Sequence, residues 1–268
     1  MAPSMLSSAM PATVSLLLAV SGAVPAVFLM WYVGRLDAKR PEPKELLRKA
    51  AFYGGLSTIP VIGVQVLLEK LNPGEVAGAL YTSFGVAGLT EETAKALAMY
   101  LVVWRHPAFD ERLDGIVYGT RVGLGFALVE NIGYLAGAES ISGFVGIFVL
   151  RAVIAVPGHA IYAGFMGYWA ARRRFDQKGP GLLGGLVIAI LLHGSYDAAL
   201  FLCGVFGKRG GAEALLILPL LVVPFLVVGL GYRRLKQHAV EALYLDDLAH
   251  AEVRPRPTLP LGMGFVLR

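Results

Sequence analysis

The chain carries charged side chains in the middle of long apolar stretches, where a membrane helix ordinarily has none. In "GLTEETAKALAMYLVV", residues 88–103, an apolar run is interrupted by Glu91, Glu92 and Lys95. Glu91 and Lys95 are four residues apart, so on a helix they share a face and can pair, whereas Glu92 is turned by about 100°. One lysine cannot neutralise both acids equally. An internal ion pair alone therefore explains the stretch less well than a chemical role for the acids.

Further ionisable and polar groups lie in other apolar stretches. In "HGSYD", His193 and Asp197 are four residues apart, and a carboxylate one turn away can hold an imidazole in one tautomer and orientation. Separate stretches supply Glu130, Asn131, Arg151 and His159. A charged residue at the centre of a membrane helix costs roughly 2.5–3.5 kcal/mol. We therefore expect these groups to face each other, or water, inside a helix bundle.

Counting along the expected helices places several of these groups at one depth. Glu91, His159 and His193 lie about 12–14 residues from the nearest strongly basic loop, or about 18–21 Å at 1.5 Å per residue. Glu130 lies roughly one turn further from that side. The sequence thus predicts a shared polar layer built from four helices.

Two histidines and several carboxylates at one depth suit a Zn²⁺ site with nitrogen and oxygen ligands and an open position for water. The metal would activate water and polarise a carbonyl, and a nearby glutamate would transfer the proton. Other protease mechanisms fit less well. The spacing of the five histidines allows no HExxH motif, Ser195 lacks a glycine-rich elbow, and Asp197 is the only deep aspartate.

Composition and hydrophobic patterning indicate a membrane protein. Of the 268 residues, 56% are hydrophobic and only 16% are charged, against nearer a quarter charged in soluble domains. The fold class we expect is an all-α polytopic membrane helix bundle with seven spans. They are roughly 12–33, 50–69, 75–104, 113–137, 143–171, 181–205 and 212–232. The single cysteine, Cys203, excludes an internal disulfide.

Loop charges predict the orientation and the domain division. Fifteen basic residues lie in loops on one side of the expected spans and three on the other, which puts the N-terminus outside and the C-terminus in the cytoplasm. The net charge of +5 is explained by these short loops, so we expect contacts with lipid headgroups and no nucleic-acid partner. We expect one transmembrane domain, 1–232, with a catalytic core of about 75–205, and a cytoplasmic tail, 233–268.

The fourth expected span has a glycine stripe. Gly115, Gly119 and Gly123 recur every fourth residue, which would let this span press against a neighbour and carry Glu130 and Asn131 to the interior. The partner we expect for Arg151 is Glu139 or an outer headgroup, reached by snorkelling. Arg121 is on the face opposite Glu130, and the sequence assigns it no role.

Two other classes of function remain open from these residues. Buried carboxylates and histidines also build proton relays in transporters, although we find no internal repeat of the kind many transporters have. A non-catalytic scaffold or receptor is the second. Bound zinc in the purified protein would favour the enzyme, and solute movement in proteoliposomes without zinc would favour the transporter. The oligomeric state is not predicted.

Four motifs resemble those of the PrsW family of intramembrane metalloproteases. They follow in the family's order over roughly residues 75–205, each on its own span: "EETAK" at 91–95, "DGIVYGTRVGLGFALVENIGY" at 114–134, "RAVIAVPGHAIYAGFMGY" at 151–168 and "HGSYD" at 193–197. The resemblance to CAAX-processing and bacteriocin-processing endopeptidases is more distant. Those usually have histidine where this chain has Glu130, and asparagine where it has Asp197.

The resemblance implies cleavage of a membrane-anchored protein in a bacterial cell membrane. In the best-known case the substrate is an anti-sigma factor, cut on its extracytoplasmic side. Carried over residue by residue, the site comprises Glu91, Glu92, Glu130, His159, His193 and Asp197. We expect Zn²⁺ on Glu130, His159 and His193, with Glu91 as general base, Glu92 orienting water or substrate, and Asp197 supporting His193. Lys95, Asn131 and Arg151 would support the site.

Overall fold

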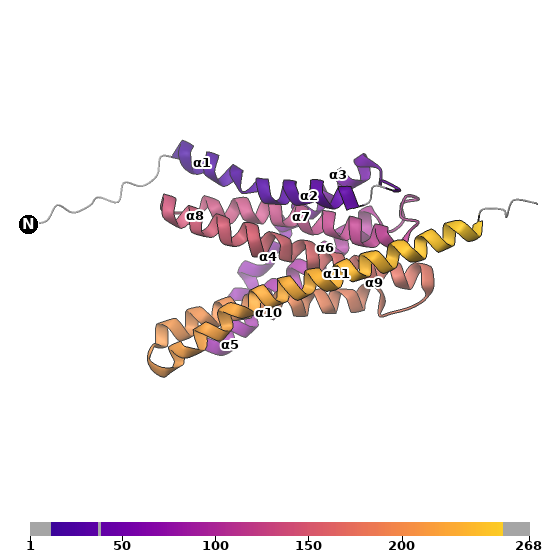
Figure 1. The fold of residues 1–268 in the computed structure, drawn as a ribbon. Helices are drawn as coiled ribbons and strands as arrows, with labels where there is room; N and C mark the ends of the chain where they lie inside the picture. Colours follow the sequence, from indigo (N-terminus) through magenta and orange to yellow (C-terminus); the bar gives the residue numbers. More distant parts are fainter. Residues whose placement is uncertain (1–11, 37–38, 254–268) are drawn as a thin grey trace, which may run out of the picture.

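The computed structural model describes residues 12–36 and 39–253, and within them every regular element is a helix (Figure 1). The elements that match the first three expected spans are α1 (Ala12–Ser21) with α2 (Ala23–Leu36), α3 (Lys44–Leu56) with α4 (Thr58–Leu68) and η1 (Glu69–Leu71), and α5 (Glu75–Leu80) with η2 (Tyr81–Gly88) and α6 (Leu89–Val102). The remaining four spans match α7 (Arg112–Ala136), α8 (Ile141–Leu150) with η3 (Arg151–Ala155) and α9 (Val156–Asp176), α10 (Gly181–Arg209), and η4 (Gly211–Leu216) with α11 (Ile217–Val253).

Five of these helical segments are long and apolar enough to cross a membrane. They are Leu16–Arg35, Lys44–Leu71, Ile141–Asp176, Gly181–Arg209 and Gly211–Ala251. Two segments do not reach this threshold. One runs from α5 through η2 to α6 and contains Glu91, Glu92 and Lys95, and the other is α7, which contains Glu130. The chain is thus a multi-pass helical membrane protein, while the count of seven spans remains a prediction.

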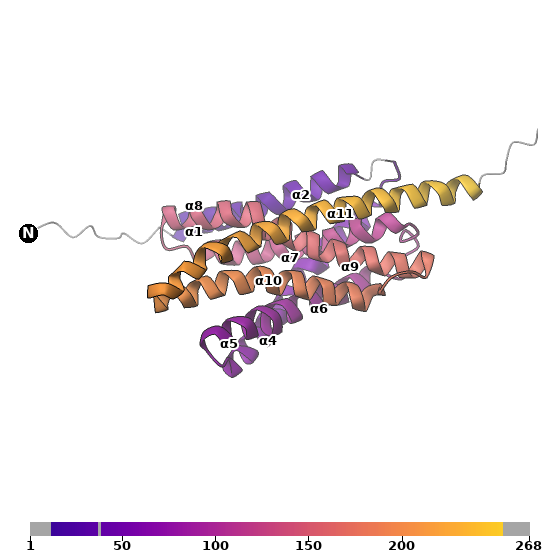
Figure 2. The same cartoon turned by 60° about the horizontal axis from the view of Figure 1, so that its bottom comes forward.

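The ends of two segments differ from those expected. The second segment begins at Lys44 rather than near residue 50, and the last helix continues to Val253 rather than ending near residue 232. Figure 2 shows α11 running beside α10 and then beyond it. Residues 233–253 of the expected tail are therefore helical, and its proline-rich part, 254–268, lies outside the described residues.

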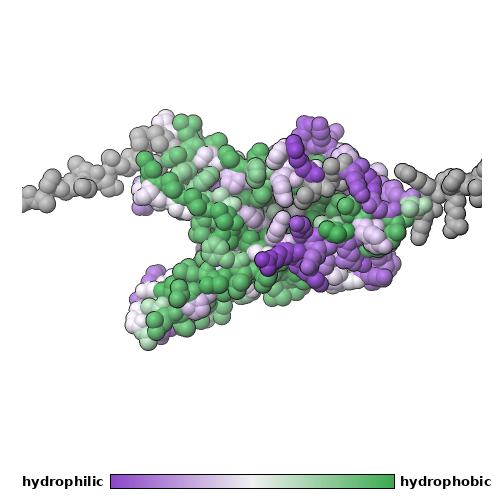
Figure 3. Space-filling model, in the orientation of Figure 1, coloured by the Kyte–Doolittle hydropathy of each residue, from purple (hydrophilic) through white to green (hydrophobic). Residues whose placement is uncertain are grey.

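Hydrophilic residues gather at one end of the bundle, which we call the charged end (Figure 3). It is formed where α3 and α7 begin, α9 ends and α11 projects. Salt bridges join these elements: Arg40 pairs with Glu111 and Asp247, and Arg112 pairs with Asp176 and Asp246. The basic loops expected on one side of the membrane thus lie together, and which side they face remains a prediction.

The far part of α11 holds the beginning of α7. The buried carboxylate of Asp246 accepts hydrogen bonds from the backbone N–H groups of Arg112 and Leu113, each at 3.0 Å. These are two of the N–H groups that a helix start leaves without an intrahelical partner, so Asp246 caps α7 from a distant part of the chain.

The glycine stripe of α7 faces α9, as its spacing predicts. A Cβ atom added at Gly115, Gly119 or Gly123 would lie 2.3–2.4 Å from a carbonyl oxygen of α9, and at Gly123 that oxygen belongs to His159. Because a real Cβ cannot approach so closely, only glycine lets the two backbones meet here. The stripe therefore sets the distance between the helix that carries Glu130 and the helix that carries His159.

Gly123→Ala is expected to lower the free energy of unfolding by about 1–3 kcal/mol, because the methyl group overpacks the α7–α9 contact. Gly133→Ala is the matched control on the same helix, since a Cβ there meets nothing within 4 Å. Both variants share the gain in helix propensity that alanine gives. Thermal unfolding in detergent compares them, and equal stability would contradict the tight contact.

Candidate metal centre

Two wide helical turns lie directly before site residues. In η2 and η3 the backbone forms i→i+5 hydrogen bonds: the N–H of Leu89 donates to the carbonyl of Phe84, and the N–H of Val156 donates to that of Arg151. Pro157 contributes to the second, because it has no N–H to donate and its ring crowds the preceding turn. Each wide turn inserts a residue and so rotates the helix that follows, which reorients the side chains carried into the site.

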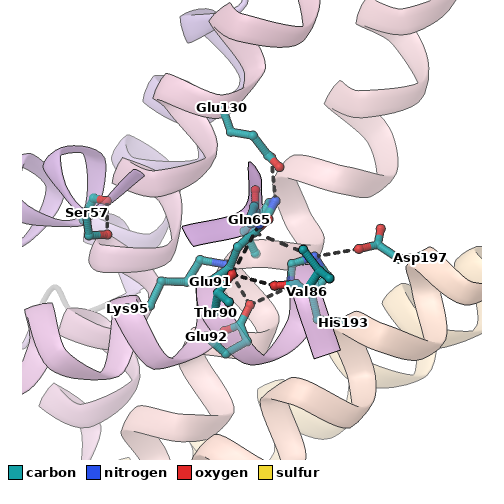
Figure 4. A network of polar contacts seen from close by, with 12 residues as sticks. Ser57, Gln65, Val86, Thr90, Glu91, Glu92, Lys95, Glu130, His193 and Asp197 are labelled. Atoms are coloured by element: carbon teal, nitrogen blue, oxygen red, sulfur yellow. Dashed lines mark hydrogen bonds and ion pairs between the residues drawn. The ribbon is translucent and has the colours of Figure 1, made fainter. Parts of the chain in front are cut away.

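The first histidine, His193, lies between three carboxylates (Figure 4). Its Nδ1 donates to Glu92 Oε1 at 2.8 Å. Its Nε2 lies 3.3 Å from Asp197 Oδ2 and 3.9 Å from Glu91 Oε2. Glu92 thus holds the ring from one side, and Nε2 is the nitrogen that faces the other acids.

The second histidine, His159, bonds through both nitrogens. Lys95 Nζ lies 2.8 Å from Nδ1, and Glu130 Oε2 lies 2.9 Å from Nε2. An ammonium group can only donate, so Nδ1 accepts from Lys95 and Nε2 donates to Glu130. The two imidazole rings meet edge to face, with centroids 5.1 Å apart.

Lys95 contacts both glutamates of α6 and also His159. Its side chain has no exposed surface, and its Nζ lies 2.7 Å from Glu92 Oε1 and 3.6 Å from Glu91 Oε2. The ammonium also lies 4.2 Å from the ring centroid of Phe126. Lys95 therefore pairs more closely with Glu92 than with Glu91. The four-residue spacing had instead favoured a pair between Lys95 and Glu91.

Three buried side chains are close enough to share a metal ion. Glu91, His159 and His193 each offer a ligand atom, and these atoms lie within 4.8 Å of one another. Glu91 Oε2 is buried and has no hydrogen-bond partner among the described residues. A buried carboxylate oxygen costs free energy unless something binds it, so the donor set fits a cation well.

Glu130, Asn131 and Arg151 form a second polar group beside the histidines. Arg151 Nη2 donates to Glu130 Oε2 at 2.5 Å and its Nε donates to Asn131 Oδ1 at 2.7 Å. The expectation that Arg151 reaches Glu139 or an outer headgroup is therefore wrong. That expectation took the nearest acid along the chain, whereas α8, which leads directly into Arg151, lies against α7 and brings the arginine to Glu130 and Asn131.

Comparison with known proteins identifies the family. A family model described as "PrsW family intramembrane metalloprotease" matches residues 42–229. The Protease PrsW of Bacillus subtilis (strain 168) is 37% identical over 180 residues, which cover 66% of this chain and 79% of that protein. The chain belongs to the PrsW family. The Protease PrsW of Clostridioides difficile (strain 630) is 34% identical over 184 residues, or 67% of this chain and 77% of that protein. No solved structure matches.

Membership of the PrsW family makes the chain a protease of the membrane, rather than the ion-coupled transporter that similar buried groups could build. The family description also states a metal dependence, which agrees with the closeness of Glu91 to the two histidines. The metal and the role of each residue are not specified by these comparisons.

The site of this PrsW-family protease opens into a cavity of about 450 Å³. Glu91, Glu130, His159, His193 and Asp197 line it, whereas Glu92 and Lys95 do not. A substrate in the cavity could therefore contact Glu91, Glu130 and Asp197, whereas Glu92 is not part of the lining.

Gln65 of α4 is a further residue of this cavity, and sequence analysis missed it. Its Nε2 donates to Glu91 Oε1 at 3.1 Å, so it holds the oxygen of Glu91 that does not face the histidines. A lone amide in the apolar run "STIPVIGVQVLL" was the signal that could have found it. Three tyrosines also line the cavity, and no spacing pointed to them: Tyr134, Tyr162 and Tyr196.

Proposed function

We propose that this protein is a zinc-dependent endopeptidase that cleaves a membrane-anchored protein at the cavity lined by Glu91, His159 and His193. The observation that carries the proposal is the closeness of these three ligand atoms, within 4.8 Å of one another, on separate buried helices. Two imidazoles and a carboxylate are typical ligands of Zn²⁺ in hydrolases that keep one position open.

The distances favour a division of roles other than the one expected from the sequence. Glu91, rather than Glu130, groups with the two histidines, and its Oε2 accepts no hydrogen bond from the described residues. We therefore propose Glu91, His159 and His193 as the ligands, and His159 would exchange one of its two ring-nitrogen contacts, to Lys95 or to Glu130, for the metal. A zinc ion held by them would supply a water of lowered pKa and an electrophile for the scissile carbonyl.

Glu130 is the residue we propose as general base. It lines the cavity, and every hydrogen bond and ion pair that it makes involves Oε2. Oε1 is then available to take a proton from the attacking water and to return it to the leaving amine. Arg151, held against Glu130 and stacked 3.9 Å from the ring centroid of Tyr134, would keep this carboxylate in place.

Glu92, Lys95, Asn131 and Asp197 position the groups that react. Glu92 would hold Nδ1 of His193, which leaves Nε2 for the metal, and Lys95 would balance the charge of Glu92. Asp197 lies 3.3 Å from Nε2 and would orient the ring from that side. Asn131 fixes Arg151 and donates to the backbone carbonyl of Gly22 at 2.6 Å. These residues would act through the histidines and Glu130 rather than on the substrate.

The substrate class comes from the resemblance to the family. It predicts a membrane-anchored protein of the anti-sigma-factor kind, cut on the extracytoplasmic side of a bacterial cytoplasmic membrane. The cavity supports cleavage on that side, because its lining includes Glu69 of η1 and Thr82 of η2. These elements adjoin α5, which lies at the end of the bundle opposite the charged end (Figure 1). We keep the N-outside topology, the membrane domain 1–232 with its core at 75–205, and the cytoplasmic tail 233–268 as parts of this proposal.

Comparing Glu91→Gln with Glu130→Gln is expected to show which glutamate binds zinc and which acts as the general base. Both variants should lose cleavage of a co-expressed membrane-anchored substrate. Glu91→Gln should also lose most bound zinc, because an amide is a poor zinc ligand, whereas Glu130→Gln should retain it. Elemental analysis of the purified variants measures this difference. The reverse result would restore the roles expected from the sequence, and zinc absent from the active wild-type protein would reject the metal mechanism.

A further inference from the structure

Arg121 of α7 is a cation that has no partner in the described part of the chain. Its side chain is half-buried, and it forms no hydrogen bond or ion pair with any described residue, although its Nε is fully buried. A Cβ atom on Gly34 of α2 would lie only 2.9 Å from its Nη2, so the guanidinium packs against the backbone of α2. A guanidinium in an apolar helix bundle costs free energy when it has no counter-charge, so binding of an anion beside it is favourable.

An apolar groove of about 400 Å³ lies between α2 and α3, with α7 as its floor. Its lining includes Met30, Phe52, Leu56, Ile59 and Gly125. Phe52 and Ile59 are each 65% exposed, and Leu56 is 44% exposed, so this face of the bundle is open to the surrounding lipid. The groove contains no charged residue, which suits a hydrocarbon chain.

Arg121 stands at one end of this groove. It is one helical turn before Gly125 on α7, and Gly34, which it contacts, is one turn after Met30 on α2. Because α2 ends at Leu36 and is followed by Lys39 and Arg40, this end of the groove is the one nearest the charged end. Arg121 therefore lies near the height where lipid headgroups meet the protein.

We propose that the groove binds an anionic phospholipid of the leaflet at the charged end, with one acyl chain between α2 and α3 and its phosphate on Arg121. Charge complementarity selects this occupant, because Arg121, which pairs with no described residue, stands where an acyl chain would end in its phosphate. The lipid packs against the outer wall of the cavity, since Thr58 and Val129 line both spaces.

The test measures lipid retained by the full-length protein purified in detergent from membranes containing phosphatidylglycerol. Wild type and Arg121→Lys are expected to retain this lipid, and Arg121→Gln to retain it roughly fivefold less strongly, the factor for about 1 kcal/mol per basic residue at a membrane surface. Arg233→Gln, on the exposed surface of α11, is the matched control and should behave as wild type. Met30→Trp should also lose lipid, because it fills the groove while leaving Arg121 in place.

Several outcomes would overturn the proposal. Retention by Arg121→Gln equal to that of wild type would remove the arginine from the site. Equal retention of phosphatidylcholine and phosphatidylglycerol would remove the charge preference, and displacement by inorganic phosphate alone would indicate a site for free anions. Loss of substrate cleavage in Arg121→Gln with unchanged lipid content would assign Arg121 to the substrate instead.

Discussion

His193→Ala is expected to release the bound metal and to abolish cleavage. The variant removes one of three proposed ligands and also leaves the buried carboxylate of Glu92 without the imidazole that it holds at 2.8 Å. The loss of activity should exceed the roughly 10–100-fold cost of losing an outer partner of a metal site. Zinc content of the purified protein and cleavage of a co-expressed membrane-anchored substrate are the two measurements.

His238→Ala provides the control for His193→Ala. This histidine is also buried, but it stacks on Tyr168 with ring centroids 4.0 Å apart, away from the cavity lining. It should keep both zinc and activity. Asp197→Asn should fall between the two, with a partial loss of each, because Asp197 is not one of the three proposed ligands but lies 3.3 Å from His193 Nε2. Full zinc occupancy in His193→Ala would contradict the ligand assignment.

Lys95→Met is expected to be among the most destabilising single changes outside the ligands. It keeps much of the side-chain volume but leaves Glu92 and Glu91 as buried carboxylates without their counter-charge. Removing one partner of a buried ion pair typically costs about 3–5 kcal/mol. Thermal unfolding in detergent, with the yield of folded protein, measures the loss.

A second substitution separates the charge effect from a packing effect. Glu92→Gln added to Lys95→Met removes the uncompensated charge, so the double variant should be more stable than Lys95→Met alone. Lys49→Met is the surface control: it breaks the exposed Glu45–Lys49 pair at 2.8 Å and should change stability little. If Lys95→Met is no less stable than Lys49→Met, the ammonium is not required to balance the buried acids.

Much of the fold could be predicted from hydrophobic patterning, because long apolar runs in lipid have few alternatives to helices. The glycine stripe likewise predicted a close helix contact, which Gly123 and His159 now make. The rotation of each helix about its own axis could not be predicted in the same way. Periodicity fixes which residues of one helix share a face, but not which neighbour that face meets.

The site shows this limit in two places. Wide turns before Glu91 and after Arg151 rotate the side chains that follow, and no ordinary helical spacing signals them. Within α6, Lys95 pairs with Glu92, three residues away, more closely than with Glu91, because residues three and four apart are both neighbours on a helix and spacing alone does not choose between them. Arg151 meets Glu130 and Asn131 because α8, which ends just before it, lies against α7, and hydrophobic periodicity does not show which helices are neighbours.

The helices that carry the site's glutamates are the ones least able to enter a bilayer alone. Neither the segment that runs from α5 to α6 nor α7 is among the five segments that are long and apolar enough to span a membrane. A translocon releasing them one at a time would expose Glu91, Glu92 and Glu130 to hydrocarbon, which is unfavourable for each charge. They are expected to remain with the insertion machinery until companion helices can shield them. Membrane insertion of these helices and assembly of the proteolytic centre would then occur together, so a partly inserted chain would have no proteolytic activity.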